Sequence, residues 1–188
     1  MIFLSFYMEL KYLNVIIGTL VGFYLIPGVN IIKDPIQSLY LINFSLVVIK
    51  LSLNKLNLTP YHQFKFIPIV YYVFISSLFY CFLMILMGAP ITIWKHQTIL
   101  YSLFVSILLM DVGFDFQSIS IIQEFESLNL KKKRRFIIQG LLTGLGSWLG
   151  SFILPLDWQS PIQVWPIPLV YGSFFGNVIS LIWCIFIQ

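Results

Sequence analysis

Residues 136–187 read FIIQGLLTGLGSWLGSFILPLDWQSPIQVWPIPLVYGSFFGNVISLIWCIFI. Two long apolar runs flank a short polar segment, Leu154–Pro166. About twenty apolar residues are enough to cross a bilayer as a helix, because each residue rises about 1.5 Å through about 30 Å of hydrocarbon. Lipid offers the backbone no hydrogen-bond partners, so both runs must be helical. This stretch therefore predicts a transmembrane helical hairpin.

The composition of the whole chain extends that prediction. The chain has 188 residues, of which 59% are hydrophobic and only 10% are charged. A soluble domain carries about 25% charged residues. No hydrophilic stretch is long enough to fold alone, so we predict one integral-membrane domain over residues 1–188, an all-α polytopic helix bundle. The N-terminus lacks a basic leader followed by a small-residue cleavage site, so we expect the first span to remain as a signal-anchor.

About six stretches are long and apolar enough to cross the membrane. The predicted spans are Tyr12–Ile32, Pro35–Leu53, Phe66–Met87, Thr98–Phe114, Phe136–Leu154 and Val164–Ile187. Within the cytosolic connection that follows the fourth span, apolar residues at helical spacing over 121–128 predict a short helix on the membrane surface.

The basic residues predict the orientation of these spans. Nine of the 11 Lys and Arg residues fall at the N-terminal side or at every second connection, and only Lys33 and Lys95 fall on the opposite side. Basic residues accumulate on the cytosolic side, so both termini are predicted to be cytosolic. The basic run at 131–135 then faces anionic lipid, which explains it better than a nucleic-acid partner does. Lys50 is expected to snorkel to the headgroups, and Asp111 to lie near the cytosolic end of its span.

The segment Leu154–Pro166 then lies on the far side, the lumen of an endomembrane. It contains one carboxylate, two tryptophans, two glutamines and three prolines. Asp157 is the only charged residue between Phe136 and the C-terminus, and Trp158 and Trp165 bracket the turn. Two interpretations stay open: a structural keystone in which Asp157 caps free amides of a helix start, and a recognition surface for a partner. Tryptophans at such a position commonly act as interfacial anchors.

Small residues form ridges on the two spans of the hairpin. One face of the first helix carries Gly140, Gly144, Ser147 and Ser151 at helical spacing. Beside this face lies a second pair, Gly146 and Gly150. The last helix carries a ridge of its own, Gly172, Gly176 and Ser180. Small residues four apart let helix backbones approach closely. The ridges predict either packing of the two helices against each other or docking of a helix from another protein.

The sequence offers little for catalysis. The two histidines, His62 and His96, fall on opposite sides of the predicted membrane. The far side has only Asp34, His96 and Asp157 as titratable candidates, and neither a metal-ligand spacing nor a nucleotide-binding glycine loop is present. We therefore predict no catalytic, cofactor-binding or metal-binding residues and no cofactor. An autonomous transferase that uses Asp157 is disfavoured, because one carboxylate neither activates a nucleophile nor holds a metal.

The hairpin segment resembles a known family. PLDWQSPIQVWP, preceded by GLGSWLGSFIL and followed by YGSFFGNVISLIW, is similar to the C-terminal hairpin of the PIG-F family of glycosylphosphatidylinositol (GPI) anchor biosynthesis. The matching positions are Pro155, Leu156, Asp157, Trp158, Pro161, Gln163, Trp165 and Pro166. The segment Gly88-Ala89-Pro90 also resembles a family motif and falls on the same predicted side. Ser160 and Ile162 depart from the family, which commonly has arginine and tryptophan there.

The resemblance implies a multi-pass endoplasmic-reticulum protein without an active site of its own. It implies a stabilising subunit that associates with the large multi-span ethanolamine phosphate transferases, PIG-O and PIG-G, which add ethanolamine phosphate to mannoses of the GPI precursor. The residues of the two matched segments are then expected to contact the partner, with membrane lipids around them and no nucleic acid. The alternative is a lipid-handling or lipid-presenting protein, similar to a scramblase, in the same pathway.

Overall fold

The computed structural model describes residues 17, 20, 31–56, 66–90, 95–111, 130–155 and 160–186. Every regular element in this part of the chain is helical, which confirms the all-α class. The elements are α2 (Pro35–Leu56), α3 (Phe66–Leu86), α4 (Lys95–Leu108), the 3₁₀ turn η1 (Leu109–Asp111), α6 (Leu130–Ser151), the 3₁₀ turn η2 (Pro161–Gln163) and α7 (Ile167–Phe186).

Three described helices are long and apolar enough to cross a membrane. The qualifying windows are Pro35–Ser52, Ile69–Leu86 and Ile167–Cys184. The central helix α4 has only 14 residues, and α6 begins with the basic run. The predicted count of six spans therefore stays a prediction. Most of the predicted first span and the whole predicted surface helix at 121–128 lie outside the described residues.

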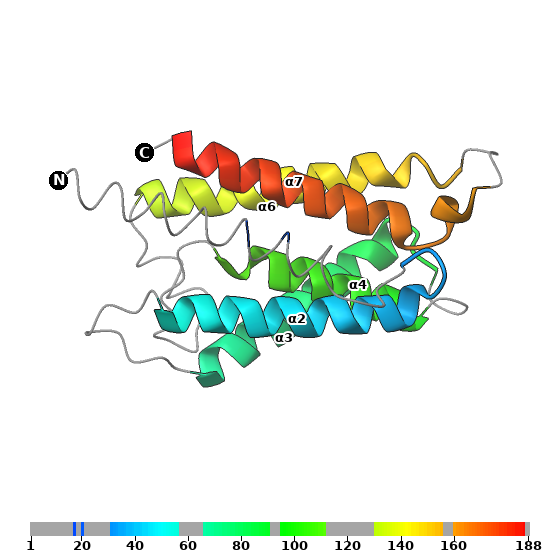
Figure 1. Cartoon of the computed structure of the whole chain (residues 1–188). Coiled ribbons are helices and arrows are strands. Elements are labelled where there is room, and N and C mark those ends of the chain that lie inside the picture. The colour runs from blue at the N-terminus through cyan, green and yellow to red at the C-terminus, as the bar shows by residue number, and fades with distance from the viewer. Residues whose placement is uncertain are drawn as a thin grey trace.

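Helix α4 lies at the centre of the described bundle. Helices α6 and α7 run side by side and cover it from one side, while α2 and α3 pack against it from the other (Figure 1). Tyr101, Phe104 and Leu108 of α4 are fully buried. They belong to one core that also includes Leu39 of α2 and Phe174 of α7. The short helix is thus the piece around which the longer helices are arranged.

Local sequence sets where the helices begin and end. The carboxylate of Asp34 accepts a hydrogen bond from the backbone amide of Gln37 at 3.1 Å, and Pro35 opens α2. An aspartate cap followed by proline is a favoured helix start, because both deal with amide groups that have no partner inside the helix. Just after the C-terminal end of α3, Gly88 has φ +90°. The amide of Gly88 donates to the carbonyl of Ile85 and that of Ala89 to the carbonyl of Met84, which is a Schellman motif.

Helices α6 and α7 meet through their glycines. A Cβ added to Gly146 would lie 2.1 Å from the carbonyl oxygen of Gly172, and one added to Gly172 would lie 2.1 Å from that of Gly146. A Cβ on Gly150 or Gly176 would lie 2.3 or 2.2 Å from a backbone oxygen of the facing helix. No other residue fits at these positions, so the backbones themselves are in contact, as expected for small-residue packing in lipid.

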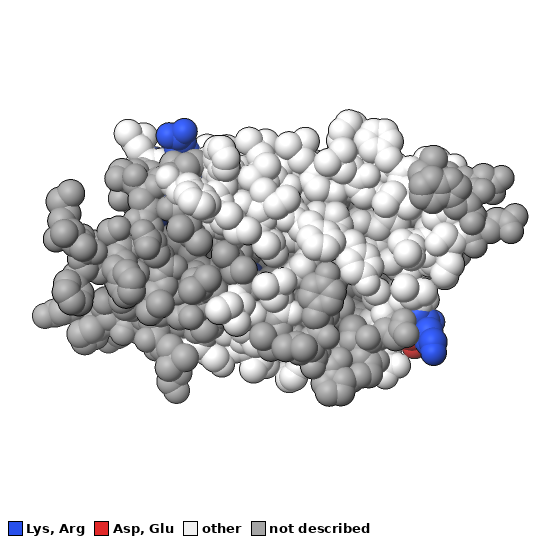
Figure 2. All heavy atoms as spheres, turned by 45° about the horizontal axis from the view of Figure 1, so that its top comes forward, with Lys and Arg blue, Asp and Glu red and all other residues white. Residues whose placement is uncertain are grey.

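The outer surface is dominated by apolar side chains. Only 11% of the apolar window of α3 is buried, and Phe74, Phe79 and Phe82 are all more than half exposed. On the face drawn in Figure 2, the visible Lys, Arg, Asp and Glu atoms of the described residues lie mainly in two small groups far apart, and the described residues between them are mostly uncharged. Such a surface is unfavourable in water and suits hydrocarbon.

Candidate functional site

The two segments that carry the family resemblance meet at one end of the bundle. The indole Nε1 of Trp165 donates to Oγ1 of Thr98 at 3.1 Å. The same Thr98 hydroxyl donates to the carbonyl of Pro90 at 3.3 Å. Thr98, in the first turn of α4, therefore links the Gly88-Ala89-Pro90 turn to the hairpin between α6 and α7. We call Pro90, Thr98, Tyr101, Ser147 and Trp165 the motif junction.

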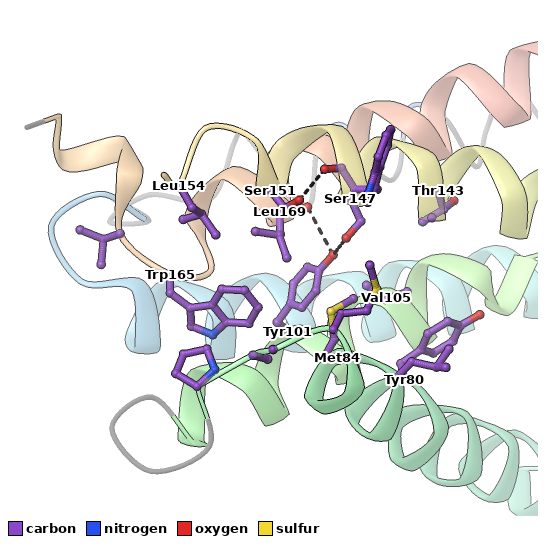
Figure 3. A pocket seen from close by; sticks show the side chains of 18 of the residues that line it. Tyr80, Met84, Tyr101, Val105, Thr143, Ser147, Ser151, Leu154, Trp165 and Leu169 are labelled. Atoms are coloured by element: carbon purple, nitrogen blue, oxygen red, sulfur yellow. Dashed lines mark hydrogen bonds between the residues drawn. The ribbon is translucent and has the colours of Figure 1, made fainter. Parts of the chain in front are cut away.

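Tyr101 continues the motif junction toward α6 and α7. Its ring stands edge-on to the Trp165 ring, with centroids 6.4 Å apart and an interplanar angle of 70°. Its hydroxyl shares a 2.6 Å hydrogen bond with the Ser147 hydroxyl and donates to the Leu169 carbonyl at 3.4 Å (Figure 3). Edge-to-face rings and a satisfied phenol are the arrangement that buried aromatics prefer. The junction is thus a packed, hydrogen-bonded joint between three parts of the chain.

Gln163 holds the hairpin turn together. Its Oε1 accepts the backbone amide of Ser160 at 3.0 Å, and its Nε2 donates to the carbonyl of Ile153 at 3.1 Å. The Ser160 hydroxyl accepts the amide of Ile162, which completes a capping box around η2. One glutamine therefore ties the end of α6 to the segment that leads into α7. Where the family commonly has arginine, serine here caps a helical turn, and Ile162 is exposed.

The remaining predicted residues of the hairpin are placed as follows. Asp157 and Trp158 lie outside the described residues, so neither interpretation of that carboxylate is tested. Pro155 and Pro161 are exposed, whereas Pro166 is buried and follows a cis peptide bond from Trp165. Their predicted contact with a partner stays a prediction.

The predicted packing residues divide into two groups. Gly146, Gly150, Gly172 and Gly176 form the contact between α6 and α7. A Cβ added to Gly140 or Gly144 would meet no atom within 4 Å. These two glycines face a cavity of about 810 Å³ instead, together with Ser147. The internal packing that the ridges allowed is thus seen for one ridge, and the other borders open space.

A second polar cluster, which sequence reasoning missed, lies at the C-terminal end of α4. The carbonyl oxygen of Leu108 accepts hydrogen bonds from Lys50 Nζ at 3.1 Å, Gln139 Nε2 at 3.2 Å and Asn177 Nδ2 at 3.2 Å. Lys50 also donates to the Ile107 carbonyl. The last carbonyls of a helix have no partner within it, and α4 ends inside the bundle, so side chains from three other helices satisfy them.

The expectation that Lys50 snorkels to the headgroups is wrong. The side chain is only 4% exposed and its ammonium group is directed at the end of α4. Hydropathy placed the residue near the end of a span, and the usual inference was solvation at the interface. The sequence carried no sign that a helix as short as α4 would end beside it.

The polar residues inside the described helices are largely used by these internal contacts. Asn43 Nδ2 donates to the Leu100 carbonyl at 3.0 Å, Asn177 donates also to Thr143, and Ser45 donates to the Ile42 carbonyl. Intrahelical and interhelical bonds of this kind are how polar side chains are accommodated in lipid. The bonds of Asn43 and Asn177 join different helices, whereas that of Ser45 lies within α2.

Within the described residues no three His, Cys, Asp or Glu side chains come close enough to hold a metal ion. His96 is exposed, and the two cysteines are free thiols, Cys81 half-buried and Cys184 buried. What the fold and the site define is a small helical protein of the membrane whose distinctive residues serve a structural joint. Several buried polar side chains of the described residues connect helices, among them Asn43, Lys50, Gln139 and Asn177.

A comparison with family models identifies that protein class more closely. Residues 16–185 match the model described as "GPI biosynthesis protein family Pig-F". The chain belongs to this family. The resemblance to the PIG-F family is thereby confirmed.

Relatives of known name point the same way. The chain is 30% identical over 111 residues to glycosylphosphatidylinositol anchor biosynthesis protein 11 of Debaryomyces hansenii, covering 56% of this chain and 47% of the relative. The protein of the same name from Candida albicans is 34% identical over 111 residues, covering 51% and 38%. A mouse protein named "GPI ethanolamine phosphate transferase, stabilizing subunit" is 54% identical over 37 residues, covering 20% and 17%. The matches thus span less than half the length of these relatives. No solved structure matches the chain.

Proposed function

We propose that this protein is a non-catalytic membrane subunit that stabilises a GPI ethanolamine phosphate transferase. The observation that carries the proposal is membership of the Pig-F family together with relatives named as stabilising subunits of that transferase. The described residues support it, because they hold no metal-ligand cluster and direct their polar groups into helix contacts. The partner adds ethanolamine phosphate to mannose of the GPI precursor, and this chain supplies helix surface to it.

The proposal includes a place in the cell. We infer a multi-pass protein of the endoplasmic-reticulum membrane with six spans, both termini in the cytosol and the motif junction at the luminal side. The apolar windows of α2, α3 and α7 support membrane insertion. Glycosylation acceptor sites inserted singly at the chain ends and at Leu156 test the orientation, because only luminal acceptors receive a glycan. Modification at either terminus, or none at Leu156, would refute it.

The function itself is tested by co-purification. The full chain carrying an affinity tag is isolated from its native membranes in mild detergent, and its partners are identified by mass spectrometry. A large multi-span ethanolamine phosphate transferase should be recovered, and depletion of the chain should lower that enzyme's abundance. Recovery of the chain without such an enzyme, or transfer of ethanolamine phosphate by the chain alone, would overturn the proposal.

Asp157 gives a sharper form of this test. We expect Asp157→Ala to insert normally but to lower the amount of co-purified transferase, because the residue belongs to the proposed partner contact. His96→Ala is a control on the same predicted side, at an exposed position of α4. Equal transferase recovery from both variants would remove Asp157 from the interface.

A further inference from the structure

The cavity bordered by Gly140 and Gly144 is large enough to be considered as a binding site. Its volume is about 810 Å³, and its walls come from α3, α4, α6 and the hairpin segment before α7. Figure 3 shows Met84 and Tyr80 on one side, Thr143 and Ser147 on the other, and Trp165 at one end beside Tyr101. The two glycines help to make this space, since no atom lies within 4 Å of where their Cβ atoms would be.

The floor of the cavity is buried, whereas side chains at its rim are exposed. Two lining residues of α4, Tyr101 and Val105, and Leu109 of η1 are at most 4% exposed. At the rim, Met87 is 67% exposed and Trp148 46%. A thin flexible chain can reach the floor.

The lining of the cavity favours an occupant that needs no hydrogen bonds. The Tyr101 hydroxyl is bonded to Ser147 and Leu169, the Ser151 hydroxyl donates to the Trp148 carbonyl, and the Gln163 amide donates to Ile153. Most of the other lining side chains are apolar, among them Leu83, Met84, Val105, Leu109 and Leu154. A buried polar occupant would lack partners here and would lose its hydration, which is costly.

The surroundings supply such an occupant. One wall belongs to α3. Its window Ile69–Leu86 is the most apolar of the three candidate spans, and only 11% of that window is buried. The rim therefore faces hydrocarbon in a bilayer. An empty space of this size would forfeit the dispersion contacts of all its lining atoms, so lipid chains are drawn into it. Toward the end marked by Gly88, Val164 and Trp165 the cavity reaches the motif junction, where the helices end.

We propose that this cavity is a phospholipid site that takes one acyl chain of a two-chain membrane lipid, with the headgroup beside the motif junction. The site lies in the isolated chain and does not depend on the proposed role as a transferase subunit. The site explains the glycines at 140 and 144 of α6: without side chains there, the wall of the cavity stays open for the acyl chain.

The test uses the full chain in phosphatidylcholine nanodiscs that contain a phosphatidylcholine with a photoreactive diazirine near the end of one acyl chain. After illumination, labelled peptides are mapped by mass spectrometry. Label should be enriched at the cavity residues Met84, Tyr101 and Val105 relative to the outward-facing Phe74 and Phe79 of α3. Uniform labelling of exposed surfaces without that enrichment would overturn the site.

Filling the cavity provides the matched comparison. Gly140→Leu with Gly144→Leu should abolish labelling of Met84 and Tyr101 and leave labelling of Phe74 unchanged. Leu141→Phe with Leu145→Phe adds bulk to the same helix at positions 60% and 51% exposed, and should leave cavity labelling intact. Unchanged cavity labelling in the glycine variant would refute the proposal.

A substitute variant and a measurement on the complex complete the test. Should the double variant not fold, Gly144→Leu alone replaces it; undiminished labelling of Met84 and Tyr101 relative to Phe74 in that variant would count against the site. A cavity that is labelled in the isolated chain but protected after co-purification with the transferase would assign it to a partner helix and overturn the lipid assignment for the complex. The variant's co-purification with the transferase, measured separately, reports on the subunit role alone.

Discussion

The indole nitrogen of Trp165 and the hydroxyl of Thr98 are joined by a 3.1 Å hydrogen bond across 67 positions of the sequence. Through this bond the hairpin before α7 is held against the first turn of α4, and the same threonine hydroxyl extends the contact to Pro90. Two motifs that are far apart in the chain thus form one structural unit.

Trp165→Phe should destabilise the protein by about 1 kcal/mol, because it removes the indole donor and retains most of the ring contact with Tyr101. For a chain of this size that corresponds to a fall of about 2–4 °C in the unfolding temperature, measured by scanning fluorimetry in detergent. Trp183→Phe, at a position 54% exposed on α7, is the control and should leave the temperature unchanged. Equal effects of the two changes would show that the Thr98 bond contributes nothing.

The glycines at the contact between α6 and α7 and those that border the cavity should respond oppositely to alanine. Gly146→Ala and Gly172→Ala place a Cβ against a backbone oxygen and should each cost about 1–3 kcal/mol, because both helix backbones must move. Gly140→Ala and Gly144→Ala meet open space and should be neutral or stabilising by up to about 1 kcal/mol through helix propensity. Unfolding in mixed micelles with increasing SDS compares the four variants. A loss of stability at Gly144 as large as that at Gly146 contradicts the assignment of the ridges.

Lys50→Met should destabilise the bundle by about 1–3 kcal/mol, since the carbonyls of Ile107 and Leu108 lose a charged donor inside the protein. Lys95→Met, which also removes one lysine charge but at an exposed site, should change stability by less than about 0.5 kcal/mol. The same SDS titration reports both values. A stable Lys50→Met variant would mean that Gln139 and Asn177 suffice to satisfy the end of α4.

Gln163 should show a graded series. Gln163→Leu removes both hydrogen bonds across the hairpin and should cost about 2 kcal/mol, whereas Gln163→Glu keeps the acceptor for the Ser160 amide and loses only the donor to Ile153. Limited proteolysis with the protein in detergent measures opening of the turn. Cleavage between Ser151 and Ser160 should rise most for leucine, less for glutamate and not at all for the exposed control Ile162→Ala. Identical cleavage rates for all three variants would show that the Gln163 hydrogen bonds do not hold the turn closed.

Much of the fold could be predicted because hydropathy in lipid leaves few alternatives. Continuous apolar runs predicted helices at positions where α2, α3 and α7 are found, and glycines spaced by four along α6 and α7 predicted close packing that is seen at Gly146 and Gly172. These features depend on the period of a single helix. They can therefore be recognised within short stretches of sequence.

Contacts between distant residues were beyond that kind of reasoning. Lys50 was placed wrongly because its partners are carbonyls of another helix, and backbone carbonyls have no signature in a sequence. The sharing of Leu108 by Lys50, Gln139 and Asn177 depends on where α4 ends in space. The bond between Trp165 and Thr98 likewise required the folded arrangement, although both flanking motifs had been recognised.

The glycine contact between α6 and α7 also bears on how the protein enters the membrane. Helix α6 is absent from the three described helices apolar enough to cross alone, whereas the helix it touches backbone to backbone, α7, is among them. Its polar residues Gln139 and Thr143 find partners only when α4 and α7 are present. Part of the free energy that holds α6 in the bundle is thus supplied by a neighbour synthesised after it. Biogenesis of the C-terminal hairpin is expected to proceed by joint insertion of the two helices, with α6 held back until α7 has emerged.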